Sequence, residues 1–135
     1  LNSASRSLIL NGSTQYITSP TLTGVDVIQT DFAVSFWTKF TSNTAGMRFI
    51  DLGGDGFAIR TGTTAGTIGF DTTGGVGTAT YSTATFNDDV WHNVVAIRRG
   101  TNLKLYVDSV QRINMTVTNA TTTFANVTVG RRNAG

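Results

Sequence analysis

Residues 32–40 read FAVSFWTKF, and this stretch decides the fold class. Its side chains fall into two alternating sets. One set is Phe32, Val34, Phe36, Thr38 and Phe40, and the other is Ala33, Ser35, Trp37 and Lys39. Successive side chains of a β-strand point to opposite faces of a sheet, so this period of two predicts a strand.

Ten further short segments along the chain also read as strands. Turn residues such as Asn11-Gly12 and Gly53–Gly56 separate them. The nearly continuous apolar run Trp91–Arg98 predicts a strand covered on both faces. No helical periodicity persists, so the spacing predicts a β-sandwich or a β-barrel. The ten segments are Ser7–Leu10, Gln15–Ile17, Arg48–Leu52, Phe57–Arg60, Thr67–Asp71, Thr78–Ser82, Trp91–Arg98, Leu103–Val107, Gln111–Val117 and Val127–Gly130.

Composition supports an all-β chain. Threonine, valine and isoleucine make up 45 of the 135 residues, and 25 of them are threonine. These branched side chains are stiff and prefer pleated surfaces, whereas strong helix formers are scarce here. The length predicts a single domain over residues 1–135.

Several classes of protein are excluded or disfavoured. The chain has no cysteine, so it has no disulfide framework, thiolate nucleophile or cysteine-based metal site. With a net charge of +2 and only two basic doublets, it has no basic face for nucleic acid. No apolar stretch is long enough for membrane insertion.

Four segments, taken in order, resemble one family. They are residues 7–13 with 15–17, the strand Phe32–Lys39, Phe86 followed by Trp91–Ala96, and Leu103–Ser109. Together they are similar to the laminin-G-like, concanavalin A-like jelly-roll domains, especially their bacterial and viral branch. The resemblance implies an antiparallel β-sandwich of the jelly-roll type.

The resemblance also implies a further strand after Val127–Gly130, and this chain stops at Gly135. A missing strand leaves unpaired backbone groups at a sheet edge. We therefore expect one of three arrangements: more chain follows, a neighbour supplies the pairing, or Val127–Gly130 itself closes the sheet.

Enzymes of this superfamily are glycosidases that mostly use paired glutamates, and this chain has no glutamate. Its eight acids are aspartates that fall mainly in turns. The single histidine, His92, is expected to be a packed, hydrogen-bonded structural residue. We predict a non-catalytic protein with no catalytic residues.

Calcium is the one cofactor that the sequence allows, because it binds carboxylate and carbonyl oxygens. The resemblance also implies calcium at the rim of the sandwich. The candidate ligands are Asp51 with Asp55, and Asp88 with Asp89. The alternative is that these aspartates stabilise turns.

A sugar site would use exposed aromatic rings with polar groups around them. Tyr106 is the best candidate, because it lies on the polar side of its strand; the alternative for it is cross-strand packing. Trp37 and Trp91 are expected in the core. Other aromatic residues not firmly assigned to a core face are Tyr16, Phe57, Tyr81 and Phe86, and the polar candidates beside Tyr106 are Lys104 and Asp108.

Two functions follow as hypotheses. The first is a recognition or adhesion module that binds a glycan or surface polysaccharide, at an extracellular location on a cell or virion. The second is a decoration or fibre domain whose partners are other protein subunits or further copies of itself. The threonine-rich, sparsely charged surface favours such assembly, since threonine loses little side-chain entropy in a contact.

Overall fold

The computed structural model describes residues 7–11, 14–20, 31–52, 57–72, 79–117 and 126–130. Within these ranges the chain forms strands and no helix, so none of its described segments is a helix that could span a membrane. The strands are β1 (Ile17–Thr18), β2 (Phe32–Thr38), β3 (Arg48–Asp51), β4 (Ala58–Thr61), β5 (Ile68–Asp71), β6 (Thr80–Tyr81), β7 (His92–Arg99), β8 (Asn102–Val107), β9 (Val110–Thr116) and β10 (Thr128–Val129).

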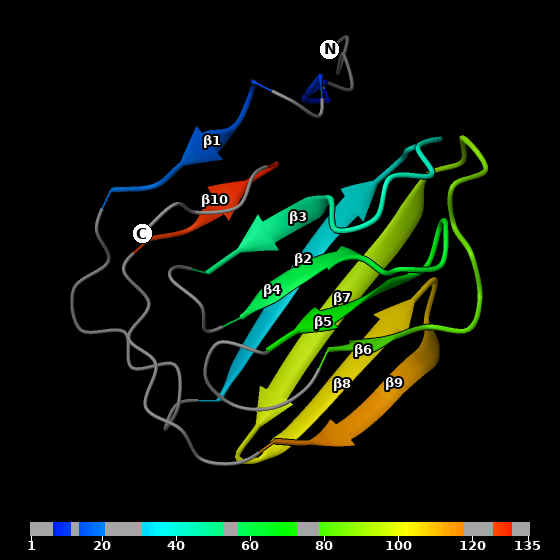
Figure 1. Ribbon diagram of the computed structural model, residues 1–135. Helices are drawn as coiled ribbons and strands as arrows, with labels where there is room; N and C mark the ends of the chain where they lie inside the picture. The colour runs from blue at the N-terminus through cyan, green and yellow to red at the C-terminus, as the bar shows by residue number, and fades with distance from the viewer. Residues whose placement is uncertain are drawn as a thin grey trace, which may run out of the picture.

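Two antiparallel sheets pack face to face as a sandwich (Figure 1). One sheet has six strands in the order β1-β10-β3-β4-β5-β6, and the other has four in the order β2-β7-β8-β9. This confirms the all-β sandwich and resolves the choice between a sandwich and a barrel. Of the expected strands, only Ser7–Leu10 joins neither sheet.

The core fills the space between the two sheets. In β2 the half-buried side chains are those of Phe32, Val34 and Phe36, as the alternation predicts. Aromatic contacts join the layers: the ring centroids of Phe36 and Phe49 are 6.0 Å apart, and those of Phe32 and Phe57 are 5.4 Å apart. A bulge at Phe49 interrupts the β3–β4 register, and both Phe49 and the next residue, Ile50, pack toward the core.

Strand β7 corrects one expectation. Its apolar run predicts cover on both faces, but burial alternates along it, with Val94 and Ala96 fully buried and Ile97 exposed. The outer face of the four-stranded sheet is thus partly open to solvent. An apolar run alone does not show whether a second layer covers a strand.

Strand β10 lies inside the six-stranded sheet, where it pairs with β1 on one side and β3 on the other. It therefore links the segment near the start of the chain to the rest of the sheet. Only four strands face the six, and this mismatch creates the site described next.

Candidate functional site

A groove of about 520 Å³ opens along the edge of the sandwich. It is lined by the edge strand β2 of one sheet and by β3 and β10 of the other. Its walls are mainly apolar, with contributions from Leu8, Leu10, Phe36, Phe40, Phe49 and Val129. We call this feature the edge groove.

Two tryptophans line the edge groove and remain exposed to solvent. Trp37 is 63% exposed and Trp91 is 47% exposed. In the β2–β7 ladder Thr38 pairs with His92, so Trp91 lies beside Lys39, one step beyond the last pair. We call Trp37, Lys39 and Trp91 the tryptophan corner.

The tryptophan corner overturns the expectation that both indoles belong to the core. Trp37 belongs to the set of β2 residues that contains Ser35 and Lys39, and that set faces away from the core. Trp91 likewise precedes the buried His92 and so points outward. The alternation along β2 predicts this outward position for Trp37, whereas the usual preference of large aromatic residues for the interior predicts the opposite.

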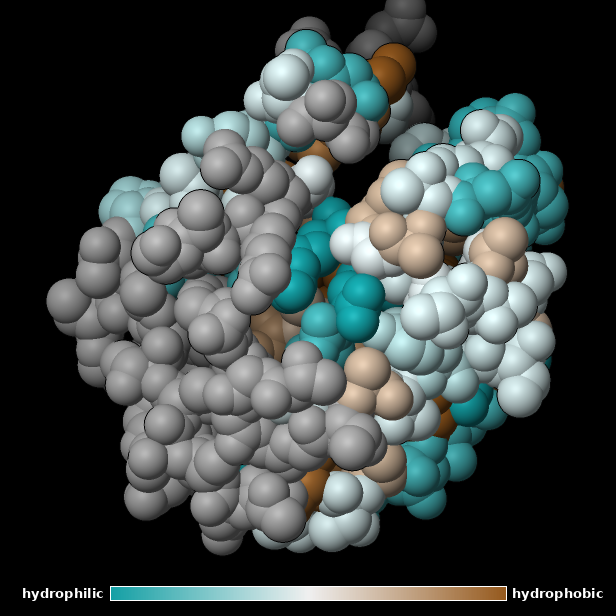
Figure 2. Space-filling view, in the orientation of Figure 1, coloured by the Kyte–Doolittle hydropathy of each residue, from teal (hydrophilic) through white to brown (hydrophobic). Residues whose placement is uncertain are grey.

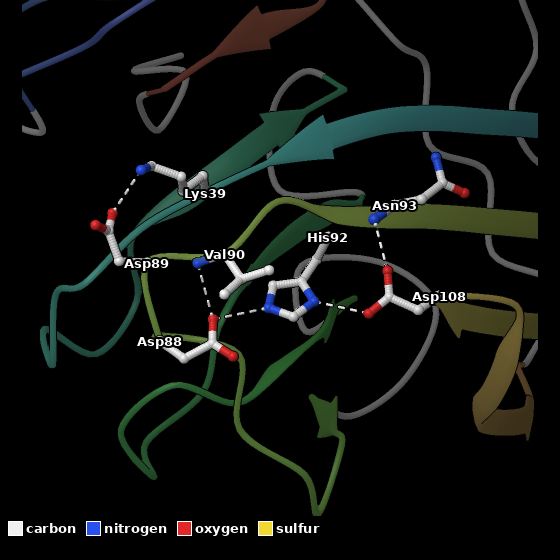
Figure 3. Close-up of polar contacts among 7 residues, drawn as sticks. All are labelled: Lys39, Asp88, Asp89, Val90, His92, Asn93 and Asp108. Atoms are coloured by element: carbon white, nitrogen blue, oxygen red, sulfur yellow. Dashed lines mark hydrogen bonds and ion pairs between the residues drawn. The ribbon is translucent and has the colours of Figure 1, made fainter.

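Charged side chains lie in and beside the tryptophan corner. Lys39 Nζ lies 2.9 Å from Asp89 Oδ1, and both groups are well exposed (Figure 3). Arg48 also lines the edge groove, and its Nη1 donates to Asp51 Oδ2 over 2.9 Å. The groove therefore offers apolar walls, two exposed indole rings and two cationic groups.

Arg48 belongs to a larger charge network on the six-stranded sheet. Its Nη2 lies 3.5 Å from Asp71 Oδ2, and Arg60 Nε lies 2.8 Å from the same oxygen. Asp51 is fully buried and Asp71 nearly so. Figure 2 views this side of the molecule and shows hydrophilic residues in a hollow of the surface. These ion pairs join β3, β4 and β5, since Arg48, Arg60 and Asp71 lie on three successive strands of the sheet.

His92 joins the loop before β7 to the turn after β8. Its Nδ1 lies 2.7 Å from Asp108 Oδ2, and its Nε2 lies 3.0 Å from Asp88 Oδ1 (Figure 3). The other oxygen of Asp108 accepts the Asn93 backbone N–H. The ring also packs edge-on against Phe86. This is the packed, hydrogen-bonded histidine that the sequence predicts.

The two carboxylates stabilise the protonated form of this ring. Burial opposes a charge on His92, but the hydrogen bonds to Asp108 and Asp88 outweigh it, so the pKa of His92 is raised. The hydrogen bond from His92 in turn lowers the pKa of Asp88 and that of Asp108. The cluster is thus an Asp–His–Asp clamp in which the protonated ring and the two ionised carboxylates stabilise one another.

This clamp predicts a pH optimum of stability. The His92 contribution is present below its unfolded pKa of 6.5 and is lost as pH rises through the higher folded value. The aspartate contributions are present above 3.8 and are lost as pH falls through the lower folded values. Urea unfolding from about pH 4 to pH 9 checks this. The variant His92→Gln should lose most stability between about pH 4 and pH 6.5. An equal loss at every pH would contradict the prediction.

The calcium candidates do not form a shared site among the described residues. Asp51 faces Arg48, Asp88 faces His92 and Asp89 faces Lys39. Asp55 lies outside the described residues. In the described part of the chain no group of three acidic, histidine or cysteine residues could hold a metal ion. Each described candidate instead pairs with a basic side chain, and calcium binding stays a prediction from the sequence.

The sugar-binding candidates separate in space. Tyr106 and Lys104 lie half-buried on the outer face of the four-stranded sheet, the same face as Trp37, and the Tyr106 hydroxyl donates to Gln111 Oε1 over 3.1 Å. Asp108 is held in the clamp described above. Tyr81 lies on the other sheet, where the Arg60 guanidinium is 5.3 Å from its ring centroid.

Phe57 and Phe86 are buried, which corrects the expectation that their rings could bind a sugar. Phe57 is 3% exposed and contacts Phe32 and Phe70 in the core, so its ring offers no surface for a ligand. Phe86 is also buried, against His92. Both flank turns, where the sequence shows no alternation to indicate which way a side chain points. Tyr16, by contrast, is exposed.

A family model for the concanavalin A-like lectin/glucanases superfamily matches residues 11–135. The chain belongs to this superfamily. The resemblance seen in the sequence is thereby confirmed, and so is the jelly-roll sandwich that it implies. No curated protein sequence matches the chain significantly.

Solved structures of the same fold include domains LG4-5 of the mouse laminin α1 chain, with a TM-score of 0.66 and 16% identity over 88% of this chain. The binding domain of Paraclostridial Mosquitocidal Protein 1 has a TM-score of 0.72 and 10% sequence identity over 92% of this chain. Botulinum neurotoxin type C has a TM-score of 0.53 and 16% sequence identity over 82% of this chain. The cell entry of that toxin is dependent upon interaction with two ganglioside molecules. The chain spans 32%, 35% and 29% of these three proteins, respectively. At these identities the likeness concerns the fold.

Proposed function

We propose that this superfamily member is a non-catalytic glycan-binding module and that the tryptophan corner is its binding surface. The observation that carries the proposal is the exposure of two tryptophans that line one groove. Burying a large aromatic ring is strongly favourable, so two such rings left in water at one groove favour a ligand-binding surface.

The chemistry of the tryptophan corner suits a sugar. The C–H face of a pyranose ring packs on an indole, and its hydroxyl groups need donors and acceptors at the rim. Lys39 supplies donors, and Asn93, the cross-strand partner of Trp37, supplies an amide on the same face. Tyr106 and Lys104 lie two strands from Trp37, about 10 Å across the sheet. They extend the surface for a longer glycan.

The arrangement of the acids supports a binding role over catalysis. Glycoside hydrolysis needs a pair of available carboxyl groups, one of them with a raised pKa. The chain has no glutamate. Among the described aspartates, Asp51 and Asp71 face arginines, Asp89 faces a lysine, and the pKa values of Asp88 and Asp108 are lowered by His92.

The related structures are consistent with this role. One comes from a chain of laminin, one is a toxin binding domain, and the third is a neurotoxin that interacts with gangliosides, which are glycolipids. We extend a surface-binding role to the present chain. In this proposal it is an extracellular module that recognises a glycan at a cell or virion surface.

Binding to a glycan array, with calcium and with a chelator, tests the proposal. Trp37→Ala and Trp91→Ala should each weaken binding of the best glycan at least about tenfold, because a tryptophan in a contact centre contributes about 2 kcal/mol or more. Tyr16→Ala is the matched control, since Tyr16 is an exposed aromatic residue outside the edge groove. Absence of any saturable glycan binding, or equal binding by all three variants, would refute the proposal.

A further inference from the structure

The outer face of the four-stranded sheet extends from Trp37 across β7 and β8 to β9. Burial alternates along β7, so Val95 and Ile97 point outward while Val94 and Ala96 are buried. Cross-strand pairs arrange the outward side chains in three rows beside the tryptophan corner, and none of these side chains lines the edge groove. The first row is Ser35, Val95, Tyr106 and Gln111, the second is Ala33, Ile97, Lys104 and Asn114, and the third is Arg99, Asn102 and Thr116.

Most cations elsewhere in the described chain are held by the fold. Lys39, Arg48 and Arg60 lie 2.9, 2.9 and 2.8 Å from aspartate oxygens. His92 lies between two aspartates. The buried Arg98 donates from Nε to a backbone carbonyl over 2.9 Å. These groups therefore have structural partners.

Lys104 differs from these cations, because it forms no ion pair with a described residue. Its side chain is half-buried on the outer face. Across the strands it faces Ile97 and Asn114, and along β8 its outward neighbours are Asn102 and Tyr106. None of these four residues is acidic, so the ammonium group has amides, a phenol ring and an apolar side chain beside it and no counter-charge among them.

Arg99 adds a second positive charge to this face. It pairs with Asn102, so it lies diagonally across from Lys104, at about 7–8 Å. Asp31 precedes β2 beside Arg99, but its Oδ1 accepts the Gly100 N–H over 2.8 Å, and Arg99 forms no ion pair with a described residue. We call Lys104 and Arg99 the basic pair. Like charges this close repel each other, and a bound anion would offset that repulsion.

The chemistry around the basic pair fits an acidic glycan. The amides of Asn102, Asn114 and Gln111 can bind hydroxyl groups, and the Tyr106 ring can cover the C–H face of a sugar. A strand of nucleic acid carries one charge about every 3.4 Å and needs a longer run of cations. A protein partner needs an apolar, aromatic centre, whereas Ile97 is the only exposed large apolar residue of the three rows.

We propose that the outer face binds an acidic glycan and that the basic pair contacts its carboxylate or sulfate groups. This role rests on the proposed glycan-binding function and specifies the charge of the ligand. The charged sugar lies over Lys104 beside Tyr106, and further sugars lead across Asn93 to Trp37 of the tryptophan corner. Trp37 supplies ring contact, and the basic pair decides between acidic and neutral glycans.

An array of neutral, uronic-acid-containing, sialylated and sulfated oligosaccharides tests the proposal. The best acidic glycan is then compared with its neutral form, which is the methyl ester of a carboxylate or the desulfated sugar. The acidic form should bind about tenfold more tightly, because each of two partly exposed ion pairs contributes about threefold. Uronate or sialylated binders would identify a carboxylate as the anionic group, and sulfated binders would identify a sulfate.

The array separates failure of this proposal from failure of the proposed function. Neutral glycans that bind as tightly as acidic ones would overturn the role of the basic pair and leave the glycan-binding function intact. Absence of binding to every glycan would overturn both. Poly-L-glutamate and a single-stranded oligothymidylate are the controls for charge alone. If either binds as tightly as the best acidic glycan, the face is a general polyanion surface and the assignment to a glycan fails.

Substitutions test the basic pair directly. Lys104→Gln and Arg99→Gln should each lower the ratio of acidic to neutral affinity about threefold, and Lys104→Arg, which keeps the charge, should preserve the ratio. Arg112→Gln is the matched control, because the Arg112 guanidinium lies 5.4 Å from the ring centroid of the buried Phe86 and so points away from the outer face. Circular dichroism verifies that each variant folds. An equal fall with Arg112→Gln would show that only net charge matters and would overturn the proposal.

Discussion

Replacing Phe70 by alanine is expected to lower the free energy of unfolding by about 3–5 kcal/mol, because it opens a cavity in the centre of the core. Phe70 is fully buried on β5, pairs across the strands with Ile59, and its ring centroid lies 5.2 Å from that of Phe57. At about 3–5 °C per kcal/mol, the melting temperature should fall by roughly 10–20 °C. Thermal unfolding followed by circular dichroism measures the change.

Trp37→Ala is the matched control for this experiment. It removes a larger aromatic side chain, but one that is mostly exposed, so the loss should stay below about 1 kcal/mol. A loss as large as that of Phe70→Ala would mean that the indole packs in the interior. Such a result would remove the basis for the tryptophan corner.

Asp51→Asn is expected to destabilise the protein by about 3 kcal/mol, because removing one partner of a buried ion pair leaves the other charge uncompensated. Asp51 is 0% exposed, and the guanidinium of Arg48 that it accepts from is itself only slightly exposed. Asp71 lies 3.5 Å from the other end of that guanidinium and compensates part of the loss. Urea unfolding of the variant measures the effect.

Asp89→Asn serves as the matched control, because Asp89 pairs with Lys39 at the surface and its left-handed backbone suits asparagine. Its expected loss is below about 1 kcal/mol. Equal losses in the two variants would show that the pair between Arg48 and Asp51 contributes no more than a surface ion pair. Since Arg48 lines the edge groove, Asp51→Asn also tests whether this network holds the groove in shape.

The sequence was most informative where a local period carried the signal. The alternation in residues 32–40 predicted β2 and both of its faces, and the order of four segments predicted the superfamily. Apolar side chains at every second position lie on one face only in a strand, so burying them requires a sheet. A chain with so many branched side chains and so few helix formers has few other ways to form a core.

The candidate site was predicted only in part. Tyr106 and Lys104 were correctly assigned to an outward face, whereas Phe57 was not, because its neighbours form a turn with no alternation. The preference of large aromatic residues for the interior predicts a core position for Trp37 and Trp91. Trp37, however, alternates with Phe36, and Phe36 is the residue that faces the core. Residue type suggested the interior, and position along the strand decided otherwise.

The sequence by itself therefore determined the class of fold, the strands and the faces of the regular strands, because these depend on residues close together in the chain. Tertiary structure alone decided that four strands face six, that β10 lies between β1 and β3, and that two exposed tryptophans line one groove. The pairing of β10 with β3 joins residues about 80 positions apart, Thr128 with Asp51. The free energy of such a pairing depends on every strand that packs beneath it, and no local pattern contains that information.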